Sequence, residues 1–287
     1  MRFSVYQSSH MGGRKYNQDL VAHAYTAQSA LLVLADGMGG HLHGEVAAQI
    51  AIQTYMQAFT EAAQPRVPEA QAFLSEVMQR AHRAIGQFAL EQKLGGSPGT
   101  TCVAALVQDG QVCWAHAGDS RLYLLRGGVT AAVTHDHSVV QQWADWGIIH
   151  PDEMKIHPER NKITNCLGGV EEMFFVEPGP SMTLQDGDVL LLCSDGLWSP
   201  LDDVEIAAAL LSDPLPQSLE QLMDVALARE GTRADNTTAV ALRWGRNEPE
   251  CSALATVCSI LDPQRANPDS ELLGRTHPSI RKLDDEA

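Results

Sequence analysis

Short apolar runs alternate with polar turns along the first part of the chain and predict β-strands there. One run, Leu31 to Ala35, is unbroken, which is typical of a strand buried on both faces. A carboxylate is costly to bury beside such a strand, yet Asp36 follows it directly and a glycine-rich turn comes next. We expect N-terminal strands at residues 3–9, 20–26 and 29–36.

Two longer segments carry apolar residues at helical spacing. They cover about residues 44–62 and 69–93, and the breaker Gln64–Pro68 separates them. We expect an antiparallel helix pair that packs one apolar stripe per helix against a sheet. Shorter helices are expected at residues 138–146, 203–212 and 217–230.

From Gly99 onward the pattern changes to strands with short turns, and Asp109-Gly110 is a strong hairpin signal. Groups of strands that alternate with helix pairs indicate an α+β protein with antiparallel sheets inside and helices outside. We expect this folded domain to span residues 1–245. Its later strands are expected at residues 100–107, 111–117, 120–125, 174–177, 188–193 and 237–244.

Residues 246–287 differ in composition, since they hold Pro, Asn and Ser and end in a cluster of acidic residues. These features predict an acidic C-terminal tail that is mostly flexible. One short apolar piece, Ala253–Leu261, is a candidate docking helix within this tail.

The charge balance narrows the class of partners. The chain has 20 Lys and Arg against 36 Asp and Glu, a formal net charge of −16, which would repel nucleic acid over most of the surface. Its six cysteines show neither a CxxC pair nor disulfide-like spacing. The N-terminus lacks the pattern of a signal peptide, and no apolar run approaches the ~20 residues that span a bilayer. We expect a cytoplasmic protein without a nucleic-acid or membrane partner.

Five carboxylates recur in one kind of local setting, at the edge of an expected strand beside a small or turn-forming residue. If antiparallel strands bring these edges together, the acids cannot all ionise without cations between them. Oxygen-only ligands select hard divalent ions such as Mg²⁺ or Mn²⁺. A pair of such ions roughly 3.5–4 Å apart activates water and holds phosphoryl oxygens in phosphatases and nucleases. The five acids are Asp19, Asp36, Asp119, Asp195 and Asp235.

The segments that hold these acids match a known family in order and spacing over residues 1 to about 245. The chain resembles the bacterial PPM family, the metal-dependent Ser/Thr protein phosphatases of 2C type. The resemblance implies a four-layer αββα architecture, with a central sandwich of two antiparallel β-sheets flanked by pairs of α-helices, and a small flap subdomain at about residues 146–168. The matching segments are Arg14-Lys15-Tyr16-Asn17-Gln18-Asp19, Asp36-Gly37-Met38-Gly39-Gly40-His41, Gly118-Asp119-Ser120-Arg121, Ser194-Asp195-Gly196-Leu197-Trp198 and Asp235-Asn236-Thr237-Thr238.

The resemblance also implies a binuclear Mn²⁺ or Mg²⁺ centre with two tightly bound ions. By position, Asp36 would bridge the two ions, and Gly37 would offer its backbone carbonyl to one of them. Asp195 and Asp235 would complete the ligands of the other ion, and Asp19 would act mainly through metal-bound waters. A metal-activated bridging water would then hydrolyse phosphoserine or phosphothreonine on protein substrates.

Further roles follow from the same resemblance. Asp119 corresponds to the acid that holds a third, weaker ion together with Asp195. Arg14 corresponds to the arginine that grips the substrate phosphate, a role that suits the planar fork of a guanidinium group. The leaving Ser or Thr oxygen needs a proton, for which His41 and a metal-bound water are both candidates.

The segment from His135 through Asn161 resembles the stretch that leads into and includes the flap. Its His135-Asp136-His137 triplet invites a metal-site hypothesis, but we favour a structural role, with Asp136 at the N-terminus of the helix expected at 138–146. Flap residues are expected to tune substrate choice. Asn165 stands where many bacterial members have an arginine, so the flap anchor is expected to differ here.

Other functional classes fit less well. A non-catalytic interaction module on the same fold would be expected to have lost some of the five acids or Arg14. A two-metal nuclease is expected to have a basic surface that binds its polymer. A Ser/His/Asp hydrolase is expected to have a Gly-x-Ser-x-Gly elbow, which the sequence lacks. We therefore predict a monomeric phosphatase that acts on phosphorylated proteins and opposes a cognate bacterial Ser/Thr kinase.

Overall fold

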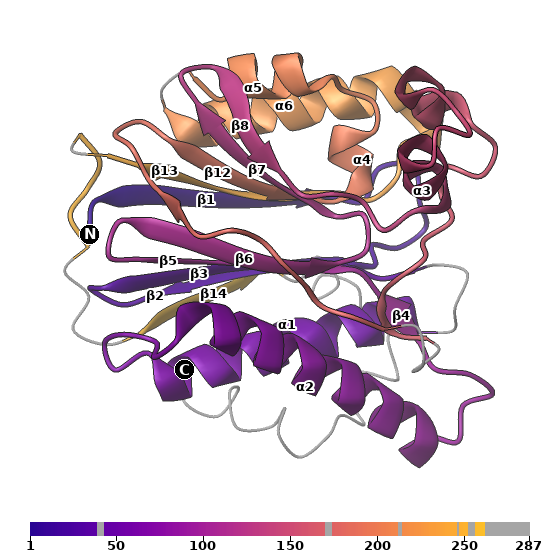
Figure 1. Cartoon of the computed structure of the whole chain (residues 1–287), viewed down its shortest axis with the longest axis horizontal. Helices are drawn as coiled ribbons and strands as arrows, with labels where there is room; N and C mark the ends of the chain where they lie inside the picture. The colour runs from indigo at the N-terminus through magenta and orange to yellow at the C-terminus, as the bar shows by residue number, and fades with distance from the viewer. Residues whose placement is uncertain (39–42, 170–173, 212–213, 246, 252–255, 262–287) are drawn as a thin grey trace.

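Two antiparallel sheets lie face to face at the centre of the molecule, and helices cover both outer faces (Figure 1). The computed structural model describes residues 1–38, 43–169, 174–211, 214–245, 247–251 and 256–261. This arrangement confirms the predicted α+β class and the four-layer αββα architecture. The sandwich matters for function because its strands end together at one edge of the molecule.

The first sheet has five strands in the order β1-β13-β12-β7-β8. Each pair of neighbours is antiparallel, and the pairing of β1 with β13 runs without interruption from Phe3 opposite Trp244 to His10 opposite Thr237. The strands are β1 (Phe3–His10), β7 (Arg121–Arg126), β8 (Val129–Val133), β12 (Val189–Cys193) and β13 (Thr237–Trp244).

The second sheet has seven strands in the order β10-β6-β5-β3-β2-β14, with β11 also paired to β6. A separate two-stranded ladder joins β4 (Gly99–Thr100) to β9 (Leu167–Gly168). The strands of the large sheet are β2 (Asp19–Tyr25), β3 (Ser29–Asp36), β5 (Cys102–Gln108), β6 (Gln111–Ala117), β10 (Glu177–Pro178), β11 (Met182–Thr183) and β14 (Val257–Leu261).

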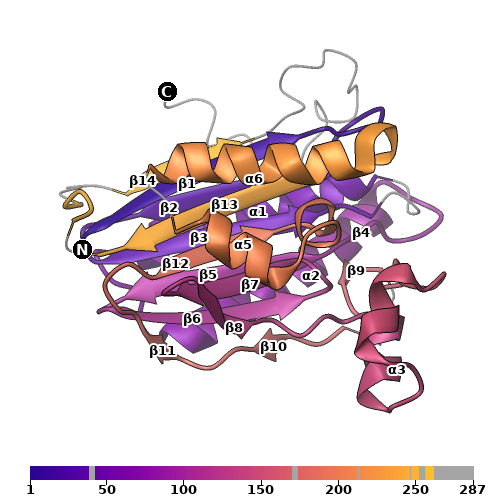
Figure 2. The same ribbon diagram turned by 90° about the horizontal axis from the view of Figure 1, so that it is seen from above.

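The helices divide between the two outer faces, as Figures 1 and 2 show. Helices α1 (Gly44–Ala62) and α2 (Ala70–Glu91) pack on the seven-stranded sheet, and α5 (Asp203–Ala209) and α6 (Leu215–Glu230) lie over the five-stranded sheet. Helix α3 (Val139–Asp145) and a 3₁₀ helix at Pro151–Ile156 project from one end of the sandwich (Figure 2).

Three apolar cores hold the layers together. One lies between α1, α2 and the seven-stranded sheet, another between the two sheets, and the third between the five-stranded sheet and helices α4 (Asp195–Trp198), α5 and α6. Leu31 faces the first core and Leu32 faces the second, because successive residues of a strand point to opposite faces. The unbroken apolar run before Asp36 is therefore explained by burial of β3 on both faces.

Strand β14 corrects one prediction. The apolar piece at 253–261 was a candidate docking helix, but residues 257–261 form a strand that pairs with β2, with Val257 opposite Tyr25 and Leu261 opposite Val21. A strand here covers the edge of β2, which would otherwise leave its backbone groups unpaired. The domain boundary near Gly245 stays a prediction. Strand β14 lies beyond that boundary in the sequence and pairs with the seven-stranded sheet.

Smaller differences concern short elements. The strand expected at 174–177 is limited to the pairing of Glu177–Pro178 with β6, and Met182–Thr183 adds a second short pairing. Strand β8 was not predicted, and its residues alternate between exposed and half-buried positions. Asp195–Trp198, which come just after the strand expected at 188–193, form a short helix that was not predicted.

Candidate metal centre

The five predicted acids come together at one edge of the sandwich. Asp19 begins β2 and Asp36 ends β3, and the two residues lie directly opposite each other in the antiparallel ladder. Asp119 lies in the turn between β6 and β7, Asp195 follows β12 as the first residue of α4, and Asp235 precedes β13. Both sheets thus contribute acids to the same place.

A cavity of about 990 Å³ opens at this edge. Of the residues predicted to bind metal or phosphate, it is lined by Asp36, Gly37, Asp119, Asp195, Asp235 and Arg14. Asp19 is only 2% exposed and is not among the residues that line the cavity. His41 lies outside the described residues, so its place relative to the cavity stays a prediction.

The electrostatics of the cluster favour cation binding. Desolvation raises the pKa of Asp19 to about 6 and that of Asp119 to about 7. Desolvation, followed by the charges of neighbouring acids, raises the pKa of Asp36 and of Asp195 well above the ordinary value. Carboxyl groups held this close resist ionising together unless positive charge is placed among them.

Asp19 gives a direct test of whether a metal fits. Its Oδ2 accepts a hydrogen bond of 2.7 Å from the Ser194 hydroxyl, and its backbone N–H donates to Asn17 Oδ1 at 3.0 Å. Its Oδ1 is buried and has no hydrogen-bond partner among the described residues. Such an oxygen costs about 1–3 kcal/mol or more unless a cation or its water satisfies it. A set of carboxylate oxygens with one unpaired member fits a hard divalent ion.

Gly37 owes its identity to close packing. A Cβ at this position would lie 2.4 Å from the Gly44 carbonyl oxygen, so any other residue would displace the start of α1. The Gly37 N–H donates to the Gln18 carbonyl at 3.1 Å, and Met38 N–H donates to Gly99 O at 3.1 Å. These bonds hold the backbone after Asp36 at the wall of the cavity.

Arg14 is placed by a loop that packs against the segment before β13. Gly12 has a φ of +61°, and a Cβ there would lie 2.2 Å from the Asp235 carbonyl oxygen. The Arg14 guanidinium forms an ion pair with the Asp235 carboxylate, and this contact raises the pKa of Arg14. The Arg14 side chain remains 55% exposed at the cavity, so it is available to an anionic ligand.

The turn that carries Asp119 is held from two sides. The Trp198 indole N–H donates to the Asp119 carbonyl at 2.9 Å, and Gly118 N–H donates to His137 Nδ1 at 3.1 Å. Arg121 lies over the Trp198 ring with its guanidinium carbon 3.6 Å from the ring centroid. The neighbours of Asp119 therefore form a rigid support that the sequence motifs alone did not reveal.

Asp136 has a structural role, as predicted, but not at the N-terminus of a helix. It accepts two hydrogen bonds from Arg121, at 2.8 and 2.7 Å. The N-cap of α3 is Ser138, whose hydroxyl accepts from Gln141 N–H at 3.2 Å. Arg121 is thus the partner that holds the Asp136 carboxylate, and an added effect of Asp136 on the helix dipole stays a prediction.

Ser194 and Glu177 were missed by sequence reasoning. Ser194 directly follows the buried strand β12 and precedes Asp195 in one of the matching segments, but the segment did not indicate a role for its hydroxyl. Glu177 joins His116 and His137 in a group whose ligand atoms lie within 4.8 Å of one another. Its distance along the chain from both histidines left no local pattern to find.

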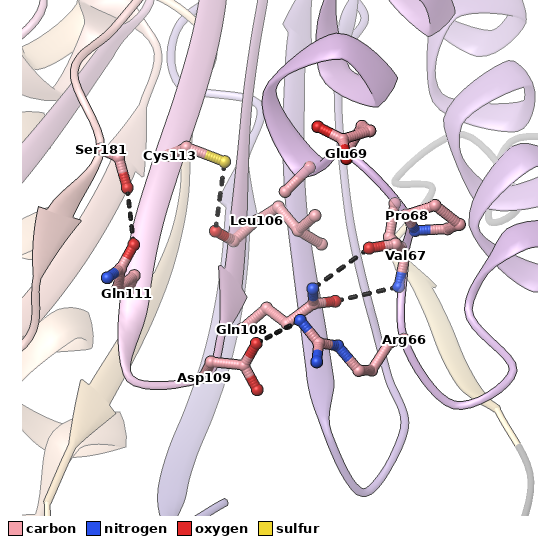
Figure 3. Close-up of a pocket in the computed structure, with 11 residues that line it drawn as sticks. Arg66, Val67, Pro68, Glu69, Leu106, Gln108, Asp109, Gln111, Cys113 and Ser181 are labelled. Carbon is pink, nitrogen blue, oxygen red and sulfur yellow. Dashed lines mark hydrogen bonds and ion pairs between the residues drawn. The ribbon is translucent and has the colours of Figure 1, made fainter.

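A second cavity, of about 590 Å³, lies at the other end of β5 and β6, by their hairpin (Figure 3). The Gln108 amide donates to Val67 O at 3.1 Å and accepts from Val67 N–H at 2.9 Å, and Arg66 forms an ion pair with Asp109. These groups bind one another across the cavity. They form a packed seam between the hairpin and the start of α2.

None of the helices in the described part of the chain combines the length and apolar character that a bilayer crossing requires. All six cysteines are free thiols.

The two-sheet sandwich and the acidic cluster at its edge define a class, the metal-dependent Ser/Thr protein phosphatases. Residues 6–235 match the family model described as protein phosphatase 2C. The chain belongs to this family, which confirms the resemblance read from its motifs.

Relatives and solved structures agree with this assignment. Protein phosphatase PhpP of Streptococcus pneumoniae (strain D39) is 32% identical over 240 residues, which cover 83% of this chain and 95% of PhpP. Serine/threonine protein phosphatase PstP of Mycobacterium tuberculosis (strain H37Rv) is 38% identical over 231 residues, 79% of this chain and 42% of that longer protein.

The solved structure of the M. tuberculosis phosphatase PstP/Ppp has a TM-score of 0.75 and 34% identity, and the match covers 86% of this chain and 100% of that one. A structure of the PstP catalytic domain in complex with two manganese ions has a TM-score of 0.70 and 32% identity, over 84% of this chain and 98% of that one. The matches therefore extend over both sheets and the acidic edge.

Proposed function

We propose that this chain hydrolyses phosphoserine and phosphothreonine on proteins at a binuclear centre built from its acidic edge. The observation that carries the proposal is the convergence of Asp36, Asp119, Asp195 and Asp235 on the cavity that also presents Arg14. The unpaired Oδ1 of buried Asp19 supports it, because this oxygen needs a cation or a water of its shell. The relative whose structure holds two manganese ions supports it further.

Each acid has its own place in the proposal. Asp36 is affected by the charges of all four other acids, so it is the candidate bridge between two ions, with the backbone carbonyl of Gly37 as a further candidate ligand. Asp195 follows β12 and Asp235 precedes β13, both strands of the five-stranded sheet, and these two acids would hold the second ion. When bound, two such ions lower the pKa of water so that it can attack phosphorus, and they neutralise charge on the phosphoryl oxygens.

The remaining residues orient substrate and acids. Arg14 would exchange its contact with Asp235 for a bidentate contact with the substrate phosphate, as the geometry of its guanidinium allows. Ser194 holds one oxygen of Asp19, so that the other oxygen faces an ion or its water. Asp119, together with Asp195, would hold a third, weaker ion. The proton for the leaving oxygen has two candidate sources, His41 and water.

The finer biological statements belong to the same proposal. Mn²⁺ and Mg²⁺ both suit the oxygen ligands, and availability decides between them. We propose that the substrates are phosphoproteins made by a cognate bacterial Ser/Thr kinase. We also propose that the enzyme works as a monomer in the cytoplasm.

The test is phosphate release from a phosphothreonine peptide by protein stripped of metal, with Mn²⁺ or Mg²⁺ then added back. We expect release only after metal addition, and little release from a matched phosphotyrosine peptide. A folded protein that binds Mn²⁺ but releases no phosphate would favour the alternative of a binding module on this fold.

A further inference from the structure

Three segments of the chain meet at His137, which is only 5% exposed. Its backbone N–H donates to the Gly118 carbonyl at 3.0 Å, and its Nδ1 accepts from Gly118 N–H at 3.1 Å. Its own carbonyl accepts from Thr164 N–H at 2.8 Å. One residue thus binds both polar groups of Gly118 and the last part of the predicted flap.

Asn165 fixes the orientation of the His137 ring. The Phe175 N–H donates to Asn165 Oδ1 at 3.2 Å, and the Phe175 carbonyl accepts from Asn165 Nδ2 at 2.8 Å. These two backbone groups define which end of the amide is nitrogen. Asn165 Nδ2 lies 2.9 Å from His137 Nδ1 and is therefore a donor to it.

The protonation of His137 follows from its partners. Both Gly118 N–H and Asn165 Nδ2 donate to Nδ1, so Nδ1 carries a lone pair and no proton. The proton of the neutral ring then lies on Nε2, which donates to Glu177 Oε2 at 2.9 Å. Burial and the nearby His116 ring lower the pKa of His137, which agrees with a neutral ring.

This arrangement decides against a metal site at His116, His137 and Glu177. The buried Nδ1 of His116 has no partner among the described residues, which by itself would favour an ion. A histidine that binds a metal through Nε2, however, normally donates a proton from Nδ1. At His137 two donors already face Nδ1, so Nε2 must keep its proton and cannot bind an ion.

The hydrogen bonds of His137 instead reach the acidic edge. Gly118 has a φ of +111°, and a Cβ there would meet Thr101 at 2.6 Å, so the turn is tightly enclosed. The next residue is Asp119, which lines the metal cavity together with Thr164 and Asn165. A shift at His137 would therefore move both the turn that carries Asp119 and the part of the cavity lining formed by Thr164 and Asn165.

We infer that His137 and Asn165 are positioning residues that hold the Gly118–Asp119 turn against the Thr164–Asn165 segment and so set how tightly the Asp119 position binds its divalent ion. The inference rests on the proposed function, which gives Asp119 a third, weaker ion. It assigns the two residues a task through hydrogen bonds, without contact to substrate or ion.

Two substitutions at His137 separate the roles of the two ring nitrogens. In His137→Asn the amide oxygen lies near the place of Nδ1 and can still accept from Gly118 and Asn165. In His137→Gln the amide nitrogen lies near the place of Nε2 and can still donate to Glu177, but the acceptor for Gly118 is lost. Glu177→Gln is the matched control, because it alters only the Nε2 side.

The experiment titrates Mn²⁺ alone into each metal-stripped protein by calorimetry and measures hydrogen exchange of the Gly118 amide. In His137→Gln we expect the weak Mn²⁺ event to lose about fivefold or more in affinity, the tight events to stay unchanged, and the Gly118 amide to exchange faster. In His137→Asn and Glu177→Gln we expect the weak affinity to stay within about twofold of the wild type. In Asn165→Leu we expect the same loss of weak Mn²⁺ affinity as in His137→Gln. This variant provides the test if the histidine variants do not fold.

Equal effects of His137→Asn and His137→Gln would overturn the inference, as would a wild type without a weak Mn²⁺ event. An equal loss at the tight and weak events would also overturn it, since that pattern reports a general structural defect. A failure of the proposed function is distinguishable from these outcomes. The wild type would then release no phosphate, but the Mn²⁺ affinities and the Gly118 exchange rates of the variants could still be compared with those of the wild type.

Discussion

Ser194 donates its hydroxyl hydrogen to Asp19 Oδ2 at 2.7 Å, and this bond joins the two sheets at the edge that carries the acids. Ser194 follows β12 of the five-stranded sheet, and Asp19 begins β2 of the seven-stranded sheet. Both residues are buried, so the bond also fixes the spacing between the sheets at this point. The acidic cluster is therefore a product of how the sheets stack: Asp19 and Asp36 come from the seven-stranded sheet, Asp195 and Asp235 flank strands of the five-stranded sheet, and Asp119 lies in the turn between β6 and β7 that joins the two sheets.

Arg14 is expected to act on substrate binding more than on metal binding. Replacing it with lysine keeps the charge but removes the bidentate fork, so we expect KM for a phosphothreonine peptide to rise by about tenfold. Mn²⁺ affinity should stay close to that of the wild type. Steady-state kinetics and a Mn²⁺ titration on the same preparation give both quantities, and unchanged KM would remove Arg14 from the phosphate site.

The stability of the metal-free protein should fall as pH rises through the range of the raised carboxyl pKa values. Asp19 and Asp119 have pKa values of about 6 and about 7 in the folded protein, against 3.8 as the ordinary value. The folded state therefore binds more protons than the unfolded state between about pH 4 and 7, so these groups stabilise the fold below pH 4 and lose that contribution by pH 7.

Mn²⁺ should reverse this loss, because it replaces the protons among the carboxylates. We expect the rise in Tm on adding Mn²⁺ to be larger at pH 8 than at pH 5.5, as measured by differential scanning calorimetry at constant ionic strength. An equal rise at both pH values would contradict the assignment of the raised pKa values to the metal-binding acids.

Strand β14 gives a prediction about the C-terminal region. Truncation after Gly245 removes the partner of β2 and the packing of Leu261 on the core between the sheets. Each kcal/mol lost lowers Tm by about 2–4 °C in a domain of this size, and we expect a loss of several degrees. Truncation after Leu261 is the matched control and should leave Tm and turnover unchanged. Equal Tm values for the two truncations would show that β14 adds no stability.

The acidic edge could be predicted because its signals are local. Asp36 and Asp195 each follow an apolar run and precede a glycine, so each motif indicates a carboxylate at the end of a strand. The order of the motifs then identified the family and, with it, the four-layer fold. Helices α1 and α2 were found nearly to the residue because each has a long apolar face.

The missed features depend on partners that are distant in the sequence. Asp136 was assigned to the helix that follows it, but folding places the guanidinium of Arg121 against it. Residues 257–261 are too short to show a strand pattern, and only the open edge of β2 makes them one. The hydrogen bond from His137 to Glu177 joins residues 40 positions apart, so no local sequence pattern could predict it.

We propose that the five acids form one catalytic metal centre, and a substitution at Asp36 is the strongest test of this proposal. Asp36→Asn keeps the shape of the side chain but removes the charge that would bridge two ions. We would measure Mn²⁺ stoichiometry by calorimetry and phosphate release from a phosphothreonine peptide, in the wild type and in this variant. We expect the variant to lose tight Mn²⁺ binding and nearly all turnover. A variant that still binds two Mn²⁺ ions tightly and keeps activity within about tenfold of the wild type would contradict this proposal.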